Sequence, residues 1–158
     1  MSTSLITIST KSNVCEVAKK MSESKVSSIL LTEEDKKIIT DSTYNSGKLQ
    51  IVGIITQTDL AREISAKDLQ ASKINAASIM SPLITIDKDA KIGQAAEMMV
   101  KSGIKYLAVK EISGEIVGVL STTDLGRYLK QKLMQSENAY LGEELSVVDA
   151  LSFPEQLP

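Results

Sequence analysis

The 158-residue sequence has no histidine, no tryptophan, one phenylalanine and one cysteine. Without imidazole it cannot build a Ser-His-Asp or Cys-His nucleophile system, a zinc site with histidine ligands or a histidine pH switch. Cys15 alone cannot form an intrachain disulfide or a thiolate metal cage, and such cysteine usage is typical of a reducing cytoplasm. No acid-base pair or metal cluster stands at a recognisable spacing. We therefore expect no catalytic residue, no metal site and no required cofactor, and we do not expect an enzyme.

Arginine is nearly absent as well. Only Arg62 and Arg127 accompany the lysines, and 18 basic residues face 20 acidic ones. This balance argues against an arginine-rich face for nucleic acid. No apolar run approaches the roughly 20 residues that span a bilayer, and Met1 leads into Ser-Thr-Ser rather than into a basic and then apolar stretch. We expect a soluble cytoplasmic protein with neither a membrane nor a nucleic acid as its partner.

What the sequence does contain is an internal repeat. Leu5-Ile6-Thr7-Ile8 returns as Leu83-Ile84-Thr85-Ile86, and IVGIIT at 51–56 returns as IVGVLS at 116–121. Each second segment runs into Asp-Leu-x-Arg, ending at Arg62 and at Arg127. The first copy carries extra polar residues between about Thr32 and Lys48, which predict a lengthened surface hairpin loop.

Both copies predict the element order β-α-β-β-α. The LITI segments alternate at period 2, as strands do, and apolar residues recur at helical spacing over 13–21 and 91–99. Apolar strands are predicted over 29–31 and 51–55, and over 107–109 and 116–120, and Thr56 or Ser121 then opens a final helix. The predicted fold class is α/β (α+β), in which the two halves can bury their sheets against each other.

One helix end differs between the copies. Gly103 ends the second predicted helix, as a glycine just beyond a helix should. Its counterpart is Lys25. The first copy therefore either turns differently or places a non-glycine residue at positive φ, at a cost of about 1 kcal/mol.

These tandem copies resemble the cystathionine-β-synthase (CBS) domain pair, often called a Bateman module, over about residues 4–132. The resemblance is carried by Ile79-Met80-Ser81-Pro82-x-x-Thr85-Ile86, by Ser102-Gly103-Ile104, and by Gly118-Val119-Leu120-Ser121-x-x-Asp124 with Gly53-Ile54-Ile55-Thr56-x-x-Asp59. It implies two repeats at 4–66 and 78–132 that form one pseudo-twofold pair, a linker at 67–77 and a C-terminal tail at 133–158.

The resemblance also implies a regulatory or sensor module. Such modules bind adenosine-containing ligands of the AMP, ADP, ATP or S-adenosylmethionine type in clefts between the repeats, usually as a homodimer, and act on a protein partner that the sequence does not identify. The alternative is a scaffold for dimerisation or protein interaction, with vestigial clefts that bind no ligand.

The chemistry of Thr/Ser-x-x-Asp fits two roles. A carboxylate at a helix start can accept hydrogen bonds from two ribose hydroxyls, while the hydroxyl and free N–H groups of the same terminus can hold a phosphate oxygen. The same spacing is also that of a capping box, in which the hydroxyl caps an N–H and the acidic residue suits the helix dipole. Its occurrence twice, each time after a strand with glycine, favours a nucleotide role in at least one copy.

Carried over from the family, each cleft pairs the Asp of one repeat with the first strand and second-strand entrance of the other. One cleft would hold Thr56, Thr58, Asp59, Ile84, Thr85, Ile104, Lys105 and Tyr106. The other would hold Ser121, Thr123, Asp124, Ile6, Thr7, Val26, Ser27 and Ser28. Lys105 gives the first cleft a cation for phosphate, whereas Ser27 and Ser28 offer neutral donors. We therefore predict that the Asp59 cleft prefers a phosphorylated ligand and the Asp124 cleft a less charged one, or none.

The sequence departs from the family pattern in two places. Proline, common at the second-strand entrance, is replaced by Leu30 and Ala108, and the first copy has only Met1-Ser2-Thr3-Ser4 where the second has Ile79-Met80-Ser81-Pro82.

The remaining residues have structural interpretations. Each arginine stands three residues after its Asp, a spacing that favours a weak ion pair over phosphate contact. Cys15 is predicted to be buried or inert, and Met21, Met98 and Met99 to fill the core or an interface. In the tail, Leu141, Leu145 and Val148 predict a short amphipathic helix that docks on the module or on a partner.

Overall fold

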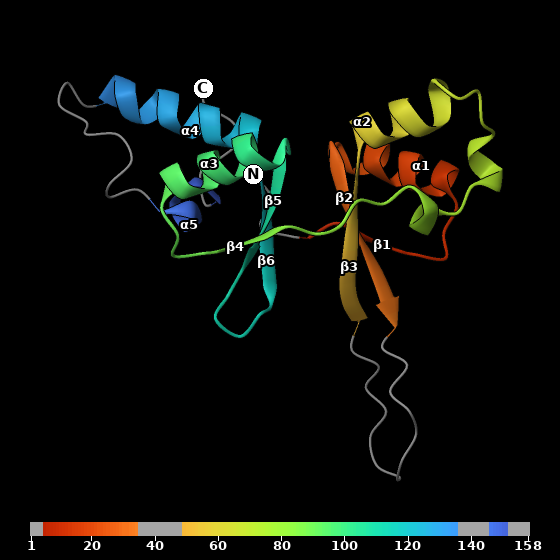
Figure 1. Ribbon diagram of the computed structural model, residues 1–158, viewed down its shortest axis with the longest axis horizontal. Coiled ribbons are helices and arrows are strands. Elements are labelled where there is room, and N and C mark those ends of the chain that lie inside the picture. Colours follow the sequence, from red (N-terminus) through yellow and green to blue (C-terminus); the bar gives the residue numbers. More distant parts are fainter. Residues whose placement is uncertain (1–4, 35–48, 136–145, 152–158) are drawn as a thin grey trace, which may run out of the picture. The chain divides into compact units, whose positions relative to one another are not determined.

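The computed structural model describes residues 5–34, 49–135 and 146–151. The chain forms two compact units, which we call the first-repeat unit (Ile6–Leu83) and the second-repeat unit (the described residues from Ile84 onward, with Leu5). Each contains a three-stranded sheet, and Figure 1 shows the helices of each unit on one face of its sheet. No helix in the described ranges is long and apolar enough to cross a membrane.

The first-repeat unit has the predicted element order. Its sheet runs β1-β2-β3, with β1 parallel to β2 and β2 antiparallel to β3. The chain ends the unit with a short α-helix, a π-helical segment and two 3-10 turns. The elements are β1 (Thr7–Ser9), α1 (Val14–Ser24), β2 (Ser28–Glu34), β3 (Leu49–Thr56), α2 (Gln57–Leu60), the π-helical segment (Ala61–Ser65) and the 3-10 turns Ala71–Lys73 and Ala76–Ser78.

The second-repeat unit repeats this topology, with sheet order β4-β5-β6 and the same strand directions. Its elements are β4 (Thr85–Asp87), α3 (Ile92–Ser102), β5 (Tyr106–Lys110), β6 (Ile116–Ser121), α4 (Thr122–Gln135) and α5 (Val147–Leu151). The predicted α/β class and β-α-β-β-α order are confirmed. The first strand of each repeat begins later than predicted, and the first helix continues about one turn further.

The hairpins show where the first copy is longer. Both ladders carry an irregularity at equivalent places, between Leu31 and Thr32 and between Val109 and Lys110. The second ladder ends at Lys110 opposite Ile116, whereas the first continues to Glu34 opposite Leu49. The extra residues therefore partly lengthen the two strands. The predicted loop itself falls at 35–48, outside the described residues.

The ends of α1 and α3 have the same geometry despite the different residues. Lys25 has φ 54° and Gly103 has φ 62°, and both backbone N–H groups donate to two carbonyls of the preceding turn. Of the two alternatives for this turn, the structure has a non-glycine residue in the left-handed region.

This turn gives a stability prediction. Replacing Lys25 with glycine should raise the free energy of unfolding by about 0.5–1 kcal/mol, because glycine adopts positive φ without the steric cost. Replacing Gly103 with lysine should lower it by a similar amount, since nothing but the backbone conformation opposes a side chain there. Urea denaturation of both variants checks this, and a destabilised Lys25→Gly protein would contradict it.

Each unit has its own core. In the first, Val14, Val17 and Met21 of α1 pack on Ile29, Leu31 and Ile55 of the sheet. In the second, Ile92, Ala95 and Met99 of α3 take the equivalent positions, and Met98 packs at the edge of this cluster. The prediction that Met21, Met98 and Met99 fill the core is thus confirmed. Cys15 is exposed on α1, so of the two predicted possibilities, a buried or an inert thiol, the buried one is wrong. Although Cys15 follows Val14 in the sequence, the helical turn directs its side chain away from the face on which Val14 and Val17 are buried.

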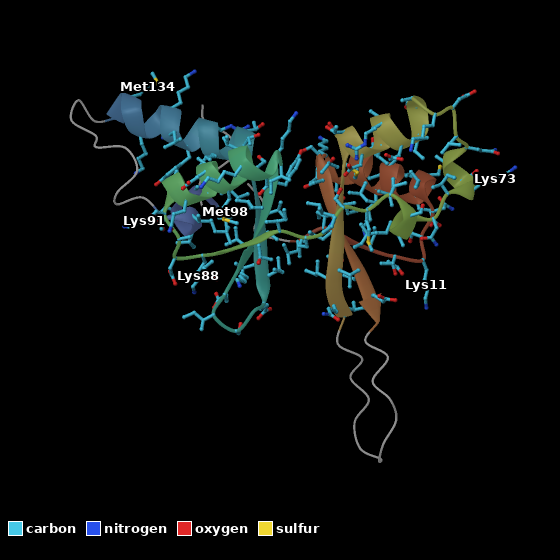
Figure 2. The ribbon with its side chains drawn as sticks, in the orientation of Figure 1. Lys11, Lys73, Lys88, Lys91, Met98 and Met134 are labelled. Carbon is cyan, nitrogen blue, oxygen red and sulfur yellow. The ribbon has the colours of Figure 1, made fainter. Side chains whose placement is uncertain are left out.

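The tail helix α5 docks on the second-repeat unit. Val147, Ala150 and Leu151 are buried, whereas the predicted contact residue Val148 is half-buried and Leu141 and Leu145 lie outside the described residues. The N–H groups of Val147 and Val148 donate to the carbonyls of Ala90 and Lys88. In Figure 2, the labelled Lys88 and Lys91 lie beside α5.

Residues 74–81 pack against the sheet and helix of the first-repeat unit, as α5 does in the second-repeat unit. The N–H of Ala76 donates to the Ser12 carbonyl, as that of Val147 donates to Ala90. The bridge Asn13–Asn75 matches Lys91–Ser146. A Cβ on Gly53 would meet the Met80 sulfur at 2.7 Å, and one on Gly118 would meet Leu151 at 2.9 Å. Each repeat is thus completed by the segment that follows it in the chain, and the motif glycine is where this segment approaches the sheet.

Candidate functional site

The acidic motif of the first repeat lies where β3 ends and α2 begins. The Asp59 carboxylate is almost fully buried, and its Oδ2 accepts from the Thr56 backbone N–H at 2.8 Å and from the Thr56 hydroxyl at 2.9 Å. In return, the Asp59 N–H donates to the Thr56 hydroxyl at 3.2 Å. This is a complete capping box.

The second repeat builds the same box at the start of α4. The Asp124 Oδ2 accepts from the Ser121 N–H at 3.2 Å and from the Ser121 hydroxyl at 2.7 Å, while the Asp124 N–H donates to that hydroxyl at 3.0 Å. Its side chain is 18% exposed, compared with 7% for Asp59. The structural role that the spacing predicts is present in both copies.

The capping boxes limit how these residues bind phosphate. In this arrangement each hydroxyl gives its only proton to the aspartate, so it has none to donate to a phosphate oxygen. The N–H groups of Gln57 and Thr122, at the first helical positions, donate to the carbonyls of Ser27 and Lys105. The hydroxyl and the first helical N–H group of each motif, which were predicted to bind phosphate, therefore already donate hydrogen bonds within the protein.

The two arginines hold their aspartates differently. Arg62 donates from Nη2 to Oδ1 of Asp59 at 2.8 Å, a direct hydrogen-bonded ion pair. Arg127 Nη1 lies 3.8 Å from Oδ1 of Asp124, which is within ion-pair range but beyond a hydrogen bond. The expected ion pairs are confirmed. Arg62 lies in the π-helical segment, whereas Arg127 lies in the regular α4.

Glu63, which was not selected from the sequence, also binds Arg62, and Lys67 in turn binds Glu63. Glu63 accepts from Arg62 Nε at 3.1 Å and pairs with Lys67. The hydrogen bonds from Lys67 first, and from Arg62 second, lower the pKa of Glu63 below its ordinary value. The i,i+4 spacing of Glu63 and Lys67 is the sequence signal that could have indicated this cluster.

The second-strand entrances lie beside the motifs of their own repeats. Ser28 pairs with Thr56 across β2 and β3, and Tyr106 pairs with Ser121 across β5 and β6. Tyr106 is partly buried, and Lys105 is exposed. Val26 and Ser27 line a cavity of about 460 Å³ in the first-repeat unit together with Lys25 and Gln57.

The first strands are fixed by the residues that replace the family's proline. The N–H groups of Leu30 and Ala108 donate to the carbonyls of Ile6 and Ile84, bonds that proline could not make. Next to them, Thr7 pairs with Leu30 and Thr85 with Ala108. Thr85 also lines a second cavity of about 460 Å³, with Asp87, Asp89 and Lys110.

The structure thus brings together, within each repeat, the acidic motif and that repeat's own second-strand entrance. Thr58 and Thr123 are exposed beside their aspartates, and Ile104 is partly buried. The combination of residues from both repeats into one cleft stays a prediction. Within the described ranges, no group of three or more acidic or cysteine side chains is placed to hold a metal ion.

Comparison with known proteins identifies the family. The family model described as "CBS domain" matches residues 1–41 and 76–131, more than half of the chain. The chain belongs to the CBS domain family. Both matched segments fall on the repeats found in the sequence, so the tandem CBS pair is confirmed.

Solved CBS structures share the fold. A CBS domain protein from Pyrobaculum aerophilum, complexed with AMP, is 25% identical, with a TM-score of 0.65 over 84% of this chain and 92% of that one. An uncharacterized conserved protein from Pyrococcus horikoshii is also 25% identical, with a TM-score of 0.66 over 88% of this chain and 92% of that one.

A curated relative, an uncharacterized protein from Methanopyrus kandleri, is 28% identical over 77% of this chain. The chain spans 56% of that relative's length, and 62% and 38% of the length of two others from Acidianus ambivalens and Methanocaldococcus jannaschii.

Proposed function

We propose that this CBS pair is a regulatory module, and not an enzyme, that binds an adenosine-type ligand of the AMP class at its acidic motifs. Occupancy would act by shifting the geometry of a homodimer or the contact with a partner protein in the cytoplasm. Binding shifts such an equilibrium only by its differential affinity for the two states.

The observation that carries the proposal is the second carboxylate oxygen of each motif. The capping box uses Oδ2 of Asp59 and of Asp124, so a ligand hydroxyl would bind Oδ1. In Asp59 this oxygen already accepts one hydrogen bond from Arg62, and a carboxylate oxygen can accept a second. The same motif appears at the same place in both repeats, directly after a strand whose glycine admits close packing. The AMP complex of the Pyrobaculum aerophilum relative supports AMP as the first ligand to test.

Thermal unfolding with ligands tests the proposal. AMP at a hundred times its Kd should stabilise the protein by about 2.7 kcal/mol, an easily measured shift in melting temperature. ADP, ATP and S-adenosylmethionine in the same panel define the ligand class, with guanosine monophosphate as the control for the base. No shift with any adenosyl compound would contradict the proposal.

A second candidate, the ligand-free scaffold, is favoured by one observation. Both capping boxes satisfy their hydroxyl and one carboxylate oxygen internally, as purely structural caps do. A protein that shows no adenosyl ligand shift but still dimerises would support this scaffold.

A further inference from the structure

The strand β6 lies at the edge of its sheet, and two of its backbone groups face outward. Ala108 lies opposite Val119 in the antiparallel ladder, and the Ala108 N–H donates to Ile84 on its other side. Opposite residues in such a ladder either bond to each other or both face away, so the N–H and carbonyl of Val119 point to the outer edge. Within the described ranges, no residue forms a bridge to Val119 from that side.

The equivalent edge of the first-repeat unit is closed. Ile54 of β3 lies opposite Leu30, whose N–H likewise donates away from β3. The Ile54 N–H donates to the Ser81 carbonyl at 3.1 Å, and the Ser81 N–H donates to the Ile54 carbonyl at 2.9 Å. Ile54 is buried, whereas its counterpart Val119 is half-buried. The segment that follows the first repeat therefore satisfies the outward-facing groups of its edge strand.

The described part of the tail ends one residue before the position that would close the β6 edge. The tail matches residues 74–81 up to Leu151, whose side chain covers the motif glycine of β6 as Met80 covers that of β3. Ser81 directly follows Met80 and forms the bridge. The residue that directly follows Leu151 is also a serine, Ser152.

We propose that Ser152 closes the edge of β6 by forming with Val119 the antiparallel bridge that Ser81 forms with Ile54. The Ser152 N–H donates to the Val119 carbonyl, and the Ser152 carbonyl accepts from the Val119 N–H. Because α5 already holds Leu151 against the sheet, only the next residue has to be ordered, and it gains two backbone hydrogen bonds.

This bridge makes the tail of the chain itself the partner of the β6 edge. An open edge strand is a template for pairing with another chain, so the bridge also excludes a second copy from this position. Val119 precedes Ser121, where the acidic motif of the second repeat begins, by two residues. Closing the edge therefore fixes the end of the strand that positions Asp124.

Disulfide cross-linking in the full chain tests the proposal. In a Cys15→Ser background, Val119→Cys with Ser152→Cys should form an intrachain disulfide. Residues in a hydrogen-bonded antiparallel pair have Cα atoms about 5.5 Å apart, within the range that a disulfide spans. Ile54→Cys with Ser81→Cys is the matched control, because its bridge is described. Both pairs should cross-link to a similar extent on non-reducing gels.

A third pair distinguishes a bridge from a tail that only passes nearby. Glu155 lies three residues beyond Ser152, about 10 Å further along an extended chain. Val119→Cys with Glu155→Cys should therefore cross-link more slowly, by about tenfold or more. Equal rates for the two tail positions would overturn the proposal. A disulfide-linked dimer of the protein with Cys15→Ser and Val119→Cys alone would also overturn it, because the edge would then belong to a second copy.

Amide hydrogen exchange on the unaltered chain tests the same bridge without substitutions. The Val119 N–H should exchange within about tenfold of the rate of the Ile54 N–H, since both are hydrogen-bonded at a covered edge. A protected Ile54 N–H together with free exchange at Val119 would show that the β6 edge is open and that the proposal is wrong. No ligand is added, so these results leave the proposed function to its own test.

Discussion

Replacing Leu151 with alanine is expected to lower the free energy of unfolding by about 2–4 kcal/mol. Leu151 is 5% exposed, and its methyl groups fill the space over Gly118 in the middle of β6. Truncation removes the buried methyl groups and leaves a cavity against a glycine, which has no side chain to fill it. Chemical denaturation measures the loss.

The control for this prediction is an apolar residue of similar chemistry on the surface. Val100 on α3 is 81% exposed, and Val100→Ala should change stability by less than about 0.5 kcal/mol. Ending the chain after Gln135 removes α5 entirely and should destabilise the protein at least as much as Leu151→Ala. A truncated protein with an unchanged melting temperature would mean that α5 does not complete the second-repeat unit.

Replacing Asp59 with alanine should lower the free energy of unfolding by about 2 kcal/mol. It should also abolish AMP binding at this motif. The substitution deprives the Thr56 N–H and hydroxyl of their acceptor and leaves Arg62 with Glu63 as its remaining ion-pair partner. Loss of a cap costs about 1 kcal/mol, and an unsatisfied part-buried donor adds to it. Urea denaturation and AMP titration measure the two effects.

Two variants separate the cap from the ligand site. Asp124→Ala should cost less stability, because Asp124 is more exposed and its arginine is not hydrogen-bonded to it. Asp59→Asn keeps an acceptor for the Thr56 N–H and should regain part of the stability, while AMP affinity stays low without a carboxylate for the ribose. Full recovery of AMP binding in Asp59→Asn would show that the charge of Asp59 has no part in it.

Most of the fold could be predicted from the sequence, because each strand and helix is indicated by the same apolar pattern in two copies. The strand and helix of each LITI copy and the ion pairs of Arg62 and Arg127 follow from local spacing, whereas for the turn at Lys25 the sequence left two alternatives and the structure decided between them. Local spacing can indicate such features because their partners lie within a few residues. The buried alternative for Cys15 was wrong because its apolar neighbours in the sequence point to a different side of the helix.

The docking of α5 and the inequality of the two motifs could not be predicted in the same way. The contact between Leu151 and Gly118 joins residues far apart in the sequence, and nothing local to either indicates the other. The two arginines contact their aspartates differently. Arg62 lies in a π-helical segment beside Glu63, with which it pairs, whereas Arg127 lies in a regular α-helix beside the buried Tyr128. Such differences are set by packing rather than by spacing. As a result, Oδ1 accepts a hydrogen bond from Arg62 in the first motif, whereas in the second it lies 3.8 Å from Arg127.

The completion of each repeat by the segment after it decides where the chain can be divided without removing part of a core. The family match to the second copy stops at residue 131, yet the unit that buries its sheet and helices continues to Leu151. As a packed unit, each repeat therefore runs from its first strand to a closing helix, Ala76–Ser78 in one copy and Val147–Leu151 in the other. A gene fusion or domain exchange that respects the family boundaries would cut each copy away from its own closing helix.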